Sequence, residues 1–230
     1  MLRIAGIAGI GALALVGGVA DAHADVRGVV RFGVLPLDLE SSDDTPVFGD
    51  DVDRAVTAYN TAAAAYDRRH GGTTTMIDAG DLGVSDTLVT FAPGLETGGD
   101  LLFFRVEALV GIGDELRTAG VGIYPLNVQT PLGRDLAAYL SVGGSASWLD
   151  REGSGDVGGL VSLRAAGGVR IAERVVIEAG YGAFVLGGVV DRSELDGIEP
   201  TADTPLPEPN AVVAAGEARG IVDLSVGVVF

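Results

Sequence analysis

Six stretches of the chain alternate, with a period of two residues, between apolar side chains and a second set made of Gly, Ser and charged side chains. They are 26–34, 101–112, 136–148, 159–171, 175–190 and 222–230. Successive side chains of a β-strand point to opposite faces, so this pattern predicts strands. Every charged residue in these stretches falls on one face, which predicts a sheet whose other face is wholly apolar.

Two weaker stretches, Thr87 to Ala92 and Thr118 to Tyr124, bring the expected number of strands to eight. Alternation alone does not distinguish a soluble sheet from a membrane barrel, but the character of the two faces does. Gly, Ser and paired charges fit the narrow interior of an eight-stranded barrel, whereas the uninterrupted apolar face suits hydrocarbon. We therefore expect an all-β fold, an eight-stranded antiparallel transmembrane β-barrel.

The register of this barrel follows from its charges. A slip by one residue would turn them toward the bilayer, where each Arg would cost roughly 2 to 4 kcal/mol near the midplane. We expect a barrel-interior charge network instead, formed by Arg27, Arg31, Arg105, Glu107, Arg164, Arg170, Glu178 and Asp223. These charges could alternatively form an ion path or a proton relay. We favour the salt-bridged plug, because eight strands leave room for little more than side chains.

The N-terminal segment, residues 1–24, has the features of a cleaved signal peptide. Arg3 precedes an apolar run, and Ala22-His23-Ala24 offers a small-residue cleavage site. The alternative is a retained membrane anchor. The apolar run argues against it, because it is short and rich in Gly. The barrel domain is then expected over residues 25–230.

Connections between the expected strands alternate in length. "TPLGRD" and Ala172 to Arg174 are predicted to be short turns at one end, opposite the longer segments 149–158 and 191–220. The first long connection contains a predicted helix, Asp51 to Arg69, with Asp residues at its start and Arg68, Arg69 and His70 in its last turn. This helix could cover the barrel mouth as a lid or be a packed loop, which we favour.

The formal net charge is −17, with fifteen Arg and no Lys, so binding to nucleic acid is not expected. Acidic residues crowd the first and last long connections: Asp38, Glu40, Asp43, Asp44, Asp50, Asp51 and Asp53, then Asp191, Glu194, Asp196, Glu199, Asp203 and Glu208. Binding of divalent cations is one interpretation, but no calcium-loop spacing is present, and solvated, self-repelling loops are the interpretation we favour.

The residues for catalysis or metal binding are few. His70 is the single His after the predicted cleavage site, and there is no Cys. Acid–base or nucleophilic chemistry and zinc sites usually need more than this. We expect no catalytic residue, no cofactor site, no metal site and no enzyme activity.

The chain resembles the small eight-stranded outer-membrane β-barrel proteins of Gram-negative bacteria, of the OmpA-like and opacity-protein type. The resemblance rests on the signal peptide, the short-turn stretch "LVSLRAAGGVRIAERVVIEAGYGAFVLGG", the alternating last strand and the terminal Phe230. It implies a monomer in the cell outer membrane, in contact with lipid and lipopolysaccharide. It also implies that Phe230 is the assembly signal read by the barrel-assembly machinery.

Three functional hypotheses follow. The first is a non-enzymatic outer-membrane barrel with a plugged polar interior and acidic extracellular loops, serving surface structure or interaction. The second is a secreted or periplasmic lipocalin-like binder of a small hydrophobic ligand, with its apolar face inside. The third is a lipid-acting outer-membrane enzyme.

Overall fold

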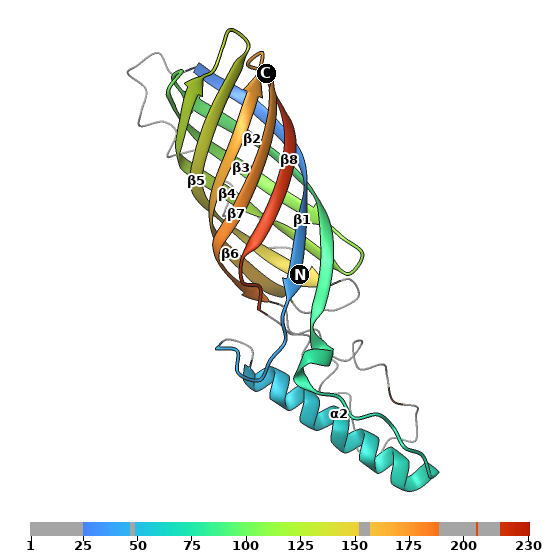
Figure 1. Ribbon diagram of the computed structural model, residues 1–230. Helices are drawn as coiled ribbons and strands as arrows, with labels where there is room; N and C mark the ends of the chain where they lie inside the picture. Colours follow the sequence, from blue (N-terminus) through green and yellow to red (C-terminus); the bar gives the residue numbers. More distant parts are fainter. Residues whose placement is uncertain (1–24, 47–48, 152–156, 189–205, 207–216) are drawn as a thin grey trace, which may run out of the picture.

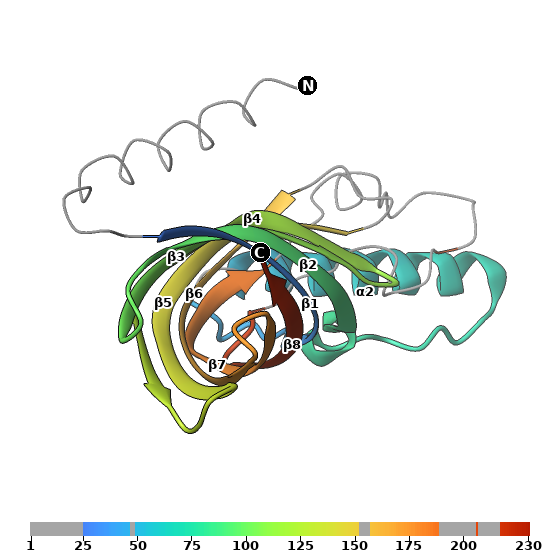
Figure 2. The same ribbon diagram turned by 90° about the horizontal axis from the view of Figure 1, so that it is seen from above.

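The computed structural model describes residues 25–46, 49–151, 157–188, 206 and 217–230. In this part of the chain, eight antiparallel strands pair in sequence order and close into a barrel when the last strand pairs with the first. Figures 1 and 2 show the closed wall of strands from the side and from above. The expected fold, an eight-stranded antiparallel barrel with a helix after its first strand, is confirmed.

The strands are nine to sixteen residues long. In chain order the elements are β1 (Asp25–Leu39), α2 (Gly49–His70), a 3-10 helix η1 (Ala79–Leu82), β2 (Val84–Gly98), β3 (Leu102–Ile112), β4 (Leu116–Pro131), β5 (Leu136–Arg151), β6 (Val157–Ile171), β7 (Val175–Gly188) and β8 (Ile221–Val229). The two weakly predicted strands exist but are longer than expected, since β2 and β4 continue well beyond 87–92 and 118–124. The predicted signal peptide and the acidic positions of the last connection, 191 to 203 and 208, lie outside the described residues.

Apolar side chains alternate along the strands and point away from the barrel axis on the outside. Large exposed ones occur on all eight strands, among them Phe32, Val89, Ile112, Leu126, Leu140, Val161, Ile177 and Leu224. Polar and charged side chains at the alternate positions of the same strands are buried. The alternation predicts this arrangement, with apolar side chains outside and polar ones inside.

Val185 is an exception, because it was expected on the outer face and is buried. The pairing of β6 with β7 passes from Arg164 with Gly182 to Leu163 with Phe184, so Ala183 is an extra residue in β7. An extra residue of this kind reverses the alternation that follows it. Val185 therefore points into the barrel.

The two ends of the barrel differ. We call the end with residues 99–101, 132–135 and 172–174 the turn end. Asp25 and Phe230 also lie at this end, and the C label in Figure 1 marks Phe230. The other end, from which the connection containing α2 leaves, is the loop end. The two predicted short turns are confirmed, and the first of them is shortened to 132–135 by the length of β4.

The turn between β6 and β7 is strained. Arg174 N donates to Ile171 O over 3.0 Å, and the two residues between them, Ala172 and Glu173, have φ values of 49° and 58°. Both central residues of such a hairpin need positive φ, which favours Asn and Gly over Ala and Glu. The sequence thus keeps two unfavourable residues at this position.

Helix α2 extends away from the loop end of the barrel (Figure 1). Its buried face includes Val52, Tyr59 and Ala63, which cluster with Ile77 and Leu82 of the segment that leads back to β2. The Asn60 side chain fixes this packing, since it donates to Ile77 O and accepts from Ile77 N, both over 2.9 Å. The helix therefore packs mainly on its own connection, and Leu206 of the connection between β7 and β8 also packs against this cluster. Among the described residues, no helix is long and apolar enough to cross a membrane.

Candidate functional site: the charged lumen

The carboxylate of Glu178 lies at the centre of the barrel interior and has no exposed surface on its side chain. Arg31 Nη1 donates to it over 2.5 Å and Arg105 Nη1 over 2.9 Å. Arg164 Nη1 forms a third ion pair at 2.8 Å, and Tyr139 donates its hydroxyl over 2.7 Å. One carboxylate of β7 thus holds side chains of β1, β3, β5 and β6.

Two further carboxylates complete this cluster. Glu107 of β3 accepts from Arg31 Nη2 and, over 3.1 Å, from Arg31 Nε. Asp223 of β8 accepts two hydrogen bonds from Arg164, of which the one from Nε is 2.6 Å long. We call the six residues Arg31, Arg105, Glu107, Arg164, Glu178 and Asp223 the charge layer. Its three guanidiniums and three carboxylates cancel in formal charge.

Arg170 forms a separate pair nearer the turn end. Its Nη2 donates to Glu96 Oε2 over 2.6 Å, and both side chains are buried. The guanidinium also lies over the Phe103 ring, 5.0 Å from its centre. Glu96 was not among the predicted network residues, because β2 was expected to end at Ala92. The predicted network contains more guanidiniums than carboxylates, so the need of Arg170 for a partner was the signal that could have revealed Glu96.

Arg27 was expected in the network and lies outside it. Its side chain is 34% exposed at the start of β1, and its ion pair is with exposed Asp25 at 3.9 Å. The expected face is correct, but the residue is so close to the barrel mouth that water reaches it. Seven of the eight predicted residues thus lie in buried or half-buried ion pairs of the lumen.

Glycines make room for these large side chains. A Cβ at Gly180 would collide with the guanidinium of Arg164, and one at Gly168 would collide with the Tyr139 ring. The small Gly and Ser residues that alternate with apolar residues in the sequence therefore leave space inside the barrel. Charged and aromatic side chains of facing strands extend into this space.

Apolar residues lie on both sides of the charge layer. Toward the turn end they are Val29, Phe103, Tyr139, Val176 and Val229. Toward the loop end a larger cluster fills the lumen: Leu37, Leu39, Val84, Leu88, Leu116, Leu149, Leu160, Val185, Ala218 and Ile221. The expectation of an inner face made of Gly, Ser and charges is therefore correct for the middle of the barrel, incomplete toward the turn end and wrong for the loop end.

The leucines of the loop end continue the inward phase of the charged residues. Leu35, Leu37 and Leu39 are spaced at two residues from Arg31 and Gly33. They were missed because β1 was expected to end at Val34. Inward positions near the loop end are apolar and pack against one another.

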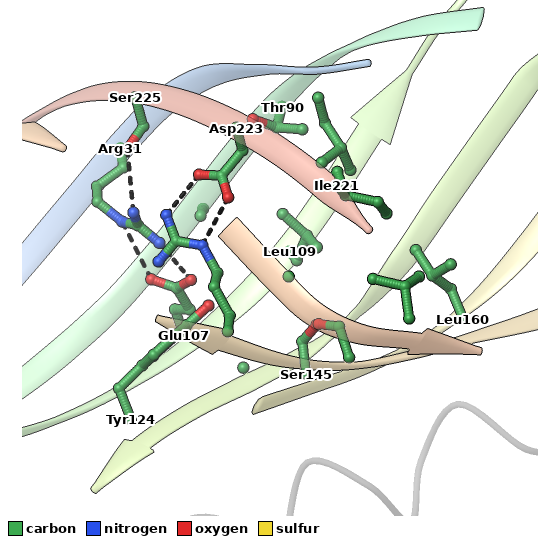
Figure 3. A pocket seen from close by; sticks show the side chains of 17 residues that line it. Arg31, Thr90, Glu107, Leu109, Tyr124, Ser145, Leu160, Ile221, Asp223 and Ser225 are labelled. Carbon is green, nitrogen blue, oxygen red and sulfur yellow. Dashed lines mark hydrogen bonds and ion pairs between the residues drawn. The ribbon is translucent and has the colours of Figure 1, made fainter. Parts of the chain in front are cut away.

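A cavity of about 70 Å³ lies between the charge layer and the leucines. Figure 3 shows Arg31, Glu107 and Asp223 on one side of it and Leu160 and Ile221 on the other. The hydroxyls of Ser145 and Ser162 also line it and are 2.9 Å apart. Its charged groups are engaged with each other, so they leave no net charge for an ionic ligand.

The remaining predicted residues lie apart from the lumen. His70 is exposed at the end of α2, where its ring is 4.4 Å from that of Tyr66. Phe230 is 77% exposed and exchanges two backbone hydrogen bonds of 2.9 Å with Gly28 of β1. Its ring covers Gly28, where a Cβ would collide with it. Within the described residues, no group of three His, Cys, Asp or Glu side chains is placed to hold a metal ion.

Replacement of Glu178 by Gln should destabilise the barrel strongly. The change keeps the shape but leaves three buried guanidiniums with two carboxylates, and breaking a buried pair costs about 3 to 5 kcal/mol. Urea unfolding in lipid vesicles measures this free energy. The matched control is Glu115→Gln, which removes an ion pair to Arg151 from a side chain that is 50% exposed and should cost at most about 1 kcal/mol. Equal stabilities of the two variants would contradict the central role of Glu178.

No protein-family model matches the sequence, and no curated protein matches it. Among solved structures, the chain is similar to Neisserial surface protein A. The two chains are 12% identical over 90% of this chain and 99% of that one, with a TM-score of 0.44. The assignment of the fold therefore depends on the strand pairing and closure described above.

Proposed function

We propose that this chain is an integral outer-membrane β-barrel protein with a plugged interior, which serves a structural or surface-interaction role and is not an enzyme. The main observation behind the proposal is that the barrel has its apolar face outside and its charged face inside. Large apolar side chains surround the barrel on the outside, and six ion-paired charges occupy its centre. A soluble barrel has the opposite arrangement.

The outer belt is too extensive for a protein that is surrounded by water. Side chains on every strand contribute to it, including Phe32, Phe91, Leu140, Leu163 and Val226, each at least 40% exposed. Contiguous apolar patches above a few hundred Å² on monomeric soluble proteins are rare and mark contact with a partner or a membrane. A belt that continues around a closed barrel is the surface that hydrocarbon requires.

The buried charges argue against a lipocalin-like binder. Such a protein needs an apolar interior with free space, whereas this lumen holds Arg105 and Glu178 at its centre and a cavity of only about 70 Å³. They also give little support to a lipid-acting enzyme. The buried carboxylates Glu96, Glu107 and Glu178 are held in ion pairs, and His70 is remote from them.

The orientation and the partners belong to this proposal. With the connections 99–101, 132–135 and 172–174 and both barrel termini toward the periplasm, the acidic first connection and α2 face the outside. Lipid and lipopolysaccharide surround the belt, and the barrel acts as a monomer. Phe230 serves as the signal that the barrel-assembly machinery recognises; its outward, exposed ring over Gly28 supports this role.

The proposal predicts that the protein is extracted from membranes only by detergent. Without boiling, the closed barrel should migrate on a denaturing gel at a different position from the heated chain, because the paired strands resist the detergent. Recovery of the folded protein in the soluble fraction without detergent would contradict the proposal.

The plugged interior predicts that the protein does not conduct ions. In planar lipid bilayers, the wild-type barrel should show no stable conductance, because the leucine cluster and the charge layer close the lumen in succession. The Leu88→Ser/Leu116→Ser variant, which changes two residues with no exposed surface in that cluster, is the comparison. A steady open-channel current in the wild-type protein would show that the lumen holds a continuous water path.

A further inference from the structure

Two adjoining hollows open at the turn end of the barrel, on the turn-end side of the charge layer. Their volumes are about 30 Å³ and about 240 Å³. Asp100, Gln129, Arg170 and Glu173 line both, so the hollows form one recess with a small inner part and a larger outer part. We call it the turn-end recess. Nothing in the proposed function requires it.

Two acceptor atoms in this recess have no donor. Glu96 is 3% exposed and lines the inner part; its Oε2 accepts from Arg170, but its Oε1 is buried without a hydrogen-bond partner. The Oε1 atom of Gln129 is also buried and without a partner. Arg170 Nε is the corresponding donor without an acceptor. Buried polar atoms are normally paired, so these three indicate a missing partner.

The charge of the recess indicates the sign of that partner. Five carboxylates line it, those of Asp25, Glu96, Asp100, Asp135 and Glu173. Three guanidiniums do so, those of Arg27, Arg134 and Arg170. The net formal charge is therefore −2, in contrast to the neutral charge layer. A cation fits this surplus better than a neutral hydroxyl compound, although a hydroxyl could also accept from Arg170 Nε.

The strained turn supports a role for Glu173. This residue lines both parts of the recess while its backbone has a φ of 58°, where Gly would be more stable. Unfavourable backbone conformations of this kind concentrate at functional sites. The carboxylate at the mouth of the recess is a reason for the chain to keep Glu at this position.

We propose that the turn-end recess binds a primary ammonium group on a short aliphatic stem. The inner part is small, at about 30 Å³, which suits an ammonium head. An ammonium group has three donors and no acceptor, so it can donate to Glu96 Oε1 and to Gln129 Oε1 but offers nothing to Arg170 Nε. The stem lies in the outer part. The chain contains no Lys, so no side chain of its own carries such a group, and the proposed ligand is a free diamine or a Lys-type side chain of a peptide.

The test is a calorimetric titration, in which 1,5-diaminopentane is added to the full-length barrel in detergent micelles and the heat of binding is measured. 1,5-Pentanediol, of the same length but without charge, is the matched control ligand. The diamine should bind and the diol should not. Nα-acetyl-lysine amide identifies the source, because comparable binding favours a peptide side chain, whereas binding of the diamine alone favours a free diamine.

Two variants separate binding from folding. Gln129→Leu removes one acceptor without changing the charge, and Glu173→Gly removes the mouth carboxylate while relieving the turn. Each should weaken diamine binding about tenfold or more. Glu173→Gly should at the same time raise the midpoint of urea unfolding, so lost binding cannot be attributed to misfolding. Glu115→Gln, at the loop end, should bind like the wild-type protein.

Three results would overturn the proposal. They are equal binding of the diol and the diamine, unchanged diamine binding by both recess variants, and no diamine binding by the folded wild-type barrel. The last result would mean that the recess holds ordered water only.

Discussion

The narrow lumen of an eight-stranded barrel cannot hold unpaired charges, and the rest of this structure depends on how Glu178 satisfies that constraint. Its carboxylate contacts guanidiniums from β1, β3 and β6 and a hydroxyl from β5. Because those long side chains converge on one point, the residues beside them must be small, as Gly168 and Gly180 are. The pattern of Gly in the sequence is thus a consequence of the central ion pairs.

The same alternation determines the outside of the barrel. Each residue that turns a charge inward places its neighbours outward, so the polar lumen and the apolar belt depend on one register. Toward the loop end the inward side chains become leucines, which pack against one another. The barrel therefore has apolar residues on its outside and also inside at its loop end. Together with the apolar run in residues 1–24, they contribute to a positive mean hydropathy of +0.38 beside a net charge of −17.

The sequence was sufficient to predict the faces of most strands and the inward side of Arg31, Arg105 and Glu178, because each follows from local alternation. Three features depended on tertiary structure. Pro93 and Gly94 obscure the continuation of β2 and with it Glu96. The extra residue Ala183 turns Val185 inward, and no local pattern marks it. The choice of partner for each guanidinium depends on the stagger between distant strands, which alternation within a strand does not contain.

The first connection illustrates the same limit. The start and end of α2 were predicted nearly to the residue from its Asp and Arg residues, whereas the surface on which it packs was not. Its apolar face is covered by Ile77 and Leu82, which follow it closely in the chain. Leu206 of the connection between β7 and β8 also packs against this cluster, so the packing of the helix depends on residues both near to it and far from it in the chain.

The central claim is that the apolar outer face contacts hydrocarbon, and site-directed spin labelling tests it most directly. The chain has no Cys, so Leu140→Cys or Val142→Cys on β5 and Thr73→Cys in the first connection each give one labelled position. In lipid vesicles, labels at 140 and 142 should collide with dissolved oxygen and be shielded from a water-soluble nickel chelate, whereas the label at 73 should show the reverse. Labels at 140 and 142 that are as accessible to nickel as the label at 73 would contradict the account.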